Sequence, residues 1–118
     1  MRLWTAQYRY SGKDRLDITV KGNDPIGKAF APSWDMVTRY KNGKITEKQY
    51  IEEYKIRMIK SCANNHEAWD WLLSQDEVTL VCFCKAGAFC HRKLLAKMLI
   101  QLGAIFMGEK SITKREEV

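Results

Sequence analysis

Residues able to carry out chemistry are concentrated between Cys82 and Arg92. Three cysteines, a histidine and an arginine fall within this short stretch. Cysteine thiolates act as nucleophiles and metal ligands, and imidazole exchanges protons near neutral pH. A guanidinium binds a phosphate or carboxylate through two parallel hydrogen bonds. This combination predicts a binding site for an anion, with covalent chemistry as a further option.

The stretch is expected to connect a buried strand to a helix. Residues 78–83 are a β-branched and apolar run, and residues 94–102 are rich in leucine and methionine. Where a strand leads into a helix, free amide groups point toward the carboxyl edge of the sheet and the helix dipole favours a negative charge. The loop between them is made of small residues, so its backbone amides can approach a ligand closely. The residues predicted to bind the anion are Lys85, Ala86, Gly87, Ala88, Phe89, Cys90, His91 and Arg92.

Cys90, His91 and Arg92 are expected in the first turn of that helix. There Arg92 would bind the anion directly, and His91 would donate or accept a proton. Because strand side chains alternate between two faces, Cys84 is expected on the same side as Cys82, near the ligand. Ordinary packing is the alternative for Cys82 and Cys90, and exposure to solvent is the alternative for Arg92.

Two other chemistries would use the same side chains. Zinc would require the three cysteines and His91 as ligands, but a Cys-x-Cys pair on a strand and an adjacent Cys-His pair converge poorly on a tetrahedral ion. In a phosphatase-like site with Cys84 as the nucleophile, Cys90 occupies the position that requires an arginine, and Arg92 comes two residues too late. We therefore expect no metal and no other cofactor, and a phosphatase is disfavoured.

The rest of the chain supplies the elements that would hold this site. The segments expected as strands are 2–8, 16–20 and 78–83, and the expected helices begin near residues 33, 46, 64 and 90. Thr46 and Gln49 form a capping-box pattern at one helix start, and Asn64 and Glu67 form a similar pattern at another. Strands alternating with helices predict a small three-layer, Rossmann-like α/β fold with a mainly parallel sheet covered on both faces.

A loop of about a dozen residues, 21–32, is longer than a structural connection usually needs, and ordered loops of that length are often functional. Tyr8, Tyr10 and Trp34 lie at the end of the first strand or beside this loop, and they are candidates to stack on a nucleotide base. Asp17, in the second strand, is a candidate to accept a hydrogen bond from a ribose hydroxyl. Core packing is the alternative for at least one of the aromatic residues.

The chain has 118 residues, of which 46% are hydrophobic, and a formal net charge of +6. This length suits one domain, which we place over residues 1–108, with a charged C-terminal tail over 109–118. Positive charge favours anionic partners, but the basic residues are scattered and carry no nucleic-acid-binding motif, so nucleic acid is not an expected partner. The sequence lacks a membrane span and a signal peptide, and we expect a cytoplasmic protein with reduced cysteines and no membrane partner.

The spacing of the reactive residues resembles a known family. Cys82-x-Cys84, five residues, then Cys90-His91-Arg92 and Leu94-Leu95-Ala96 are similar to the signature of the small α/β proteins catalogued as domain of unknown function 488. Most members carry a glutamate where Cys84 stands, and many carry an arginine where Thr19 stands. The resemblance implies a Rossmann-like fold with a pocket at the strand ends and a kinship with nucleotide-handling proteins. Small phage and bacterial proteins of such folds include binders that sequester signalling nucleotides.

We expect the chain to bind a phosphorylated small molecule, a nucleotide or a nucleotide-derived signal, and thereby to sequester it. One alternative is an enzyme that cleaves or transfers at a phosphate or glycosidic bond of a nucleotide, with Cys84, Cys90 and His91 as its catalytic residues. A second alternative is an interaction module that pairs with itself as a homo-oligomer or with another protein.

Overall fold

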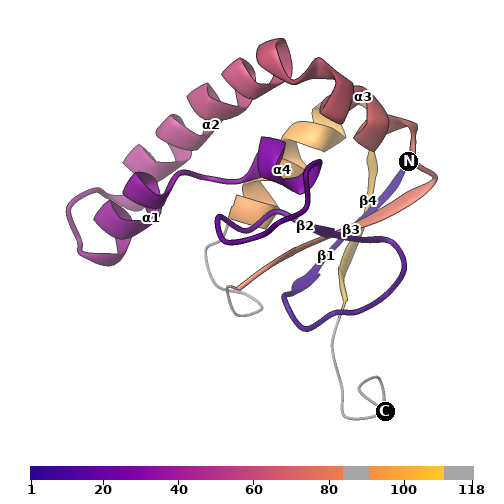
Figure 1. Ribbon diagram of the computed structural model, residues 1–118, viewed down its shortest axis with the longest axis horizontal. Coiled ribbons are helices and arrows are strands. Elements are labelled where there is room, and N and C mark those ends of the chain that lie inside the picture. Colours follow the sequence, from indigo (N-terminus) through magenta and orange to yellow (C-terminus); the bar gives the residue numbers. More distant parts are fainter. Residues whose placement is uncertain (84–90, 111–118) are drawn as a thin grey trace.

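The computed structural model describes residues 1–83 and 91–110, and Figure 1 shows how their helices and strands are arranged. The strands are β1 (Arg2–Gln7), β2 (Arg15–Asp17), β3 (Glu77–Cys82) and β4 (Ile105–Lys110). The helices are α1 (Trp34–Lys41), α2 (Glu47–Asn64), α3 (His66–Ser74) and α4 (His91–Gln101), preceded by a 3-10 turn, η1 (Gly27–Phe30).

The four strands form one parallel sheet in the order β2-β3-β1-β4. The register sets Leu3 of β1 beside Val78 of β3, and Leu16 of β2 beside Leu80 of β3. These four side chains are buried in the hydrophobic core that the helices cover. The predicted α/β class with a parallel, Rossmann-like sheet is confirmed.

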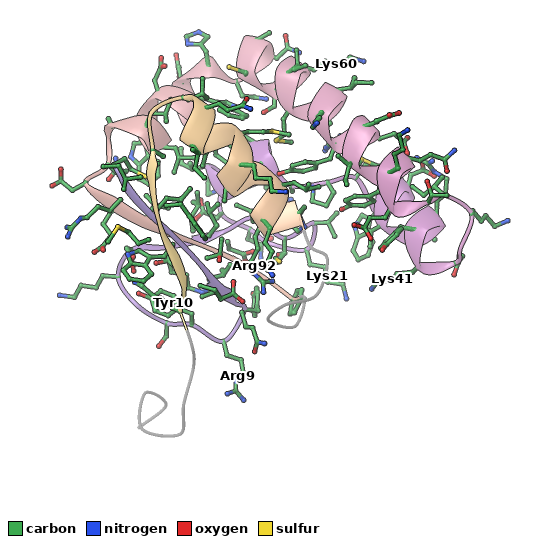
Figure 2. The ribbon with its side chains drawn as sticks, turned by 180° about the vertical axis from the view of Figure 1, so that it is seen from behind. Arg9, Tyr10, Lys21, Lys41, Lys60 and Arg92 are labelled. Atoms are coloured by element: carbon green, nitrogen blue, oxygen red, sulfur yellow. The ribbon has the colours of Figure 1, made fainter. Side chains whose placement is uncertain are left out.

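The helices of the described residues pack on one face of this sheet (Figure 1). The crossovers from β2 to β3 and from β3 to β4 move in the same direction across the sheet, so right-handed connections place their helices on the same side. The step from β1 to β2 moves the opposite way, and the connection 8–14 therefore crosses the other face. Figure 2 shows Arg9 and Tyr10 of this connection far from α2. We expected helices over both faces, but this connection covers the second one.

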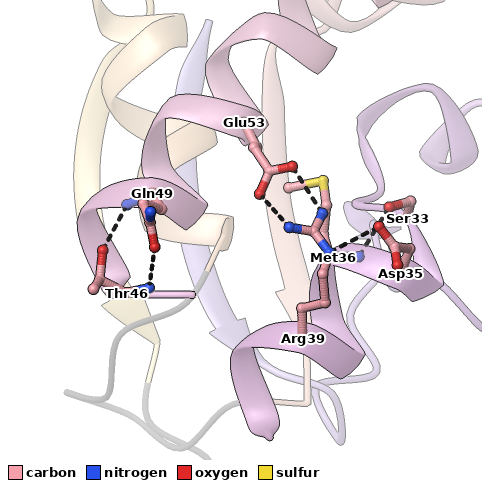
Figure 3. Close-up of polar contacts among 7 residues, drawn as sticks. All are labelled: Ser33, Asp35, Met36, Arg39, Thr46, Gln49 and Glu53. Carbon is pink, nitrogen blue, oxygen red and sulfur yellow. Dashed lines mark hydrogen bonds and ion pairs between the residues drawn. The ribbon is translucent and has the colours of Figure 1, made fainter. Parts of the chain in front are cut away.

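Two short polar networks fix α1 and α2, and Figure 3 shows both. The predicted capping box at the start of α2 is confirmed, because the backbone N–H groups of Thr46 and Gln49 each donate to the other residue's side chain. Arg39 of α1 donates two hydrogen bonds to the carboxylate of Glu53 on α2, at 2.7 and 3.0 Å. The two helices are therefore tied together beside the sheet.

The second predicted capping pattern is wrong. α2 continues through Asn64, and α3 begins at His66 without a side-chain cap. The last turn of α2 is stabilised by packing instead, since Ser61 accepts a hydrogen bond from the indole of Trp69 at 3.2 Å. The Trp69 side chain is also buried, and its packing on α2 favours the turn between the two helices.

The last strand contains a one-residue bulge. Phe106 pairs with Leu3, but Gly108 pairs with Trp4, so Met107 is an extra residue in β4. Gly108 adopts φ +127°, a conformation that other residues rarely take. A one-residue shift turns every following side chain to the opposite face of a sheet. β4 also includes Glu109 and Lys110, the first two residues of the expected tail.

Candidate ligand-binding pocket

A cavity of about 340 Å³ opens at the carboxyl ends of β2 and β3, beside the first turn of α4. This is the edge at which open parallel sheets bind their ligands, and the volume is in the range of small-molecule sites. We call it the aromatic pocket. The described residues that line it are Thr19, Val20, Lys21, Pro32, Trp34, Val37, Tyr40, Lys41, Tyr50, Phe83 and His91.

Four aromatic rings form much of its wall. Tyr40 and Tyr50 contact each other with ring centroids 5.3 Å apart, which joins the end of α1 to the start of α2. Trp34 and Phe83 are 52% and 62% exposed, although burial of a large aromatic ring is strongly favourable. Exposed rings that line a concave site are suited to stacking on a planar ligand.

The charge of the pocket is positive. Among its described lining residues, the two formally charged side chains are the lysines Lys21 and Lys41. The Lys21 ammonium lies 5.5 Å from the ring centroid of Trp34. Figure 2 shows Lys21 between Arg92 and Lys41, whereas Lys60 lies toward the other end of α2. An anionic group that enters the pocket would therefore be attracted by its two lysines.

His91 forms part of the pocket wall, but it is held in place by the fold. Its Nε2–H donates to the carbonyl oxygen of Ile18 at 2.8 Å, and its ring lies 5.8 Å from that of Tyr54. Burial lowers the pKa of His91 to about 4, despite the opposing effects of the Ile18 carbonyl and Asp17. The imidazole is thus neutral at pH 7 and links the start of α4 to the end of β2. Proton exchange near neutral pH, the role predicted for His91, does not fit this setting.

Arg92 is completely buried and binds a carboxylate of the protein itself. Its Nε and Nη2 donate to the two carboxylate oxygens of Glu109 at 3.0 and 2.8 Å, and its Nη1 donates to the sulfur of Cys82 at 3.0 Å. Partial burial raises the pKa of Glu109, but the hydrogen bonds from Arg92 outweigh this effect and the pKa lies below its ordinary value. The guanidinium therefore binds a carboxylate of β4, whereas we expected it to bind the anion of a ligand.

The bulge in β4 explains how Glu109 reaches Arg92. With Met107 inserted, Glu109 pairs with Thr5 of β1 and Lys110 pairs with Ala6. Glu109 therefore points to the helical face, where α4 carries Arg92. Lys110 points to the other face, where it forms an ion pair with Asp14 at 3.2 Å. Without the bulge, the acid and the base would exchange faces.

The structure separates the two tyrosines from each other. Tyr8 stacks on Phe83 of the aromatic pocket, with ring centroids 4.1 Å apart and an interplanar angle of 17°. Tyr10 lies on the helix-free face, where its hydroxyl donates to Asp14 and accepts from Lys110 at 2.9 Å. Tyr8 thus packs against a wall residue of the pocket without lining the pocket itself. Tyr10 belongs to a hydrogen-bond network that holds the connection 8–14 in place.

Asp17 does not line the aromatic pocket either. One of its carboxylate oxygens accepts hydrogen bonds from the backbone N–H and the hydroxyl of Thr19, at 2.9 and 2.7 Å. Gly22 approaches the carboxylate so closely that a Cβ there would lie 2.8 Å from it. The Asp17 carboxylate is therefore enclosed by the turn that follows β2. Trp34 is the predicted base-stacking residue that the structure places in the pocket.

Residues 1–103 match the protein family DUF488-N3a, described as the active DUF488-N3 subclade. The chain belongs to this family. No curated protein and no solved structure is significantly similar to it. The DUF488-N3a match extends from β1 through α4 and stops before β4, so Glu109, the partner of Arg92, lies outside the matched region.

Much of the cysteine-containing signature of the DUF488 resemblance lies beyond what the structure describes. The predicted site residues in that segment are Cys84, Lys85, Ala86, Gly87, Ala88, Phe89 and Cys90, all outside the described residues. Cys82 is buried and disulfide-bonded, so the expectation of reduced cysteines is wrong at this residue. In the described parts of the chain, no three ligating side chains come together as a metal site would require. No described helix is long and apolar enough to cross a membrane.

Sequence reasoning missed several residues of the pocket in this DUF488-N3a protein. Lys21 directly follows the second expected strand, and a cation at the carboxyl edge of a sheet was the available signal. Tyr40, Lys41 and Tyr50 lie at the end of one helix and the start of the next. No local pattern shows that this corner folds back against the sheet edge.

Proposed function

We propose that this protein binds a phosphorylated small molecule that carries a planar ring, with a nucleotide as the simplest case. The aromatic pocket is the observation that supports this function. Its exposed ring of Trp34 is suited to stack on a base, and the ammonium groups of Lys21 and Lys41 are suited to bind phosphate.

The proposed binding mode differs from the one expected from the sequence. Arg92 does not contact the ligand in this proposal, because its guanidinium is engaged by Glu109. His91 contributes shape and a neutral surface to the pocket wall. Binding without turnover is favoured, since burial lowers the pKa of His91 to about 4 and the imidazole is then not poised for proton exchange near pH 7.

Removing Trp34 or Lys21 should weaken binding while leaving the fold intact. Calorimetric titration with ADP, GDP, CDP and UDP would identify the tightest of these probes. Trp34→Ala should weaken its binding by about 1–3 kcal/mol through lost stacking, and Lys21→Ala by about 1.5 kcal/mol through a lost charge-assisted contact. Both side chains are exposed, so neither change should disturb the core.

Matched controls are available elsewhere on the surface. Trp71 is 42% exposed on α3, and Lys13 is exposed in the connection 8–14. Neither residue lines the aromatic pocket. Trp71→Ala and Lys13→Ala should therefore leave affinity within a factor of about two. Equal losses in test and control variants, or no binding of any of the four probes, would refute the proposal.

An enzyme that cleaves or transfers at a phosphate or glycosidic bond is the second candidate. The family description contains the word active, and this favours turnover for at least some members. The cysteines predicted for such chemistry, Cys84 and Cys90, lie outside the described residues. Incubating the tightest-binding nucleoside diphosphate with the protein, followed by chromatography, distinguishes a binder from an enzyme. A product that disappears in Cys84→Ser or Cys90→Ser, while affinity for the nucleoside diphosphate is retained, would establish turnover.

A further inference from the structure

A second cavity, of about 520 Å³, lies between η1, α1 and α2. We call it the helical groove. Its described lining residues are Lys28, Ala29, Ser33, Asp35, Met36, Arg39, Glu53, Ile56, Arg57, Lys60, Ser61, Asn64 and Asn65. α1 separates it from the aromatic pocket, because Ser33 and Met36 line the groove whereas Trp34 and Val37 line the pocket.

The two carboxylates of the groove, Asp35 and Glu53, both bind one arginine. Arg39 donates from Nε to Asp35 at 2.9 Å and from both terminal nitrogens to Glu53 at 2.7 and 3.0 Å (Figure 3). The other charged residues among the described lining residues are Lys28, Arg57 and Lys60. No carboxylate of the described residues forms an ion pair with any of these three cations. The groove therefore presents a positive surface.

Arg57 is held in position by the fold. Its Nε donates to the carbonyl oxygen of Ala31 at 2.8 Å, and the hydroxyls of Tyr54 and Ser61 donate to the two preceding carbonyls. Side chains of α2 thus form hydrogen bonds with three consecutive carbonyl groups, those of residues 29–31, at the end of η1. A guanidinium fixed through Nε loses little further freedom when its terminal nitrogens bind a ligand.

The lining of the groove also indicates the kind of ligand. The described lining residues include no aromatic ring, in contrast to the aromatic pocket. Ser33, Asn64 and Asn65 add polar groups to the three cations. Lys60 lies one helical turn from Arg57, about 5 Å along the axis, and Lys28 comes from the opposite wall. A chain of linked phosphates matches cations spread in this way better than a planar ring does.

We propose that the helical groove is a second anion site, which binds a small polyphosphate through Lys28, Arg57 and Lys60. The site is separate from the aromatic pocket and does not depend on nucleotide binding there. Each terminal nitrogen of Arg57 and each ammonium group can donate to a phosphate oxygen, and such charge-assisted contacts are the strong ones.

Titration of the full chain with inorganic tripolyphosphate at low ionic strength tests this site. In ¹H–¹⁵N spectra, the backbone amides of η1 and of the second half of α2 should shift. Lys60→Glu should weaken tripolyphosphate binding about tenfold or more. Lys55→Glu makes the same charge change at an exposed position of α2 that does not line the groove, and it should weaken binding by less than about threefold.

Three outcomes would overturn the proposal. They are equal losses for Lys60→Glu and Lys55→Glu, shifts confined to residues of the aromatic pocket, and tighter binding of a short single-stranded oligonucleotide than of tripolyphosphate. Trp34→Ala should leave tripolyphosphate binding unchanged. This variant therefore separates a failure of the polyphosphate proposal for the groove from a failure of the nucleotide proposal for the aromatic pocket.

Discussion

Glu109→Ala is expected to lower the free energy of unfolding by about 3 kcal/mol. The change leaves the guanidinium of Arg92 charged and completely buried, and breaking a buried ion pair from one side typically costs about 3–5 kcal/mol. We expect the lower end of that range because the Glu109 side chain is partly exposed. Urea unfolding at pH 7 measures the effect.

The exposed pair of Asp35 and Arg39 provides the control. Asp35→Ala removes a surface carboxylate, and such pairs contribute at most about 1 kcal/mol. Replacing both members of the buried pair, Arg92→Met with Glu109→Met, should recover much of the loss, because no charge is then left buried. A loss of less than 1 kcal/mol for Glu109→Ala would show that Arg92 finds an equally good partner elsewhere.

Stability should fall by about 3 kcal/mol as the pH decreases from 7 to 4, and His91 should account for this loss. The pKa of His91 is about 4 in the folded protein because of burial, against an ordinary value of 6.5. The unfolded chain therefore binds a proton between these two pH values while the folded chain does not. The stability due to neutral His91 is fully present above pH 6.5 and is lost as the pH falls toward 4.

The second histidine gives a matched control for this pH dependence. His91→Gln should flatten the profile between pH 6.5 and 4, although it also lowers stability at pH 7. His66 is exposed on α3, and His66→Gln is the matched substitution with which the profile of His91→Gln is compared. The pKa of Glu109 is lowered from its ordinary value of 4.5, so its contribution to stability is lost at lower pH than that of His91. An unchanged slope in His91→Gln would contradict the assignment.

Local patterns in the sequence predicted the elements that depend on neighbouring residues. The capping box of Thr46 and Gln49 involves groups three positions apart, and it forms as expected. The alternation of strands and helices was sufficient to predict a parallel sheet. It was not sufficient to predict which face each crossover covers, since that depends on the strand order.

The role of Arg92 could not be predicted in the same way. Its partner, Glu109, lies in a segment whose charge suggested a tail, and the partner faces Arg92 only because Met107 is inserted as a bulge. No residue pattern in the sequence before Gly108 predicts the bulge at Met107. The aromatic pocket, too, could be predicted only in part. Trp34 was predicted from its place beside a long loop. Tyr40 and Tyr50 reach the pocket through the packing of α1 on α2, which the sequence does not show.

Binding of a nucleotide in the aromatic pocket is tested most directly by the indole N–H signal of Trp34 in ¹H–¹⁵N spectra, assigned with Trp34→Phe. Titration with the tightest nucleoside diphosphate should shift this signal and the backbone amides of Lys21 and Phe83, while the indole signal of Trp71 stays in place. The matching nucleoside, which lacks phosphate, should bind at least about tenfold more weakly, because it makes no contact with the lysine ammonium groups. An unmoved Trp34 signal at saturation, or equal affinity for nucleoside and nucleotide, would contradict nucleotide binding in this pocket.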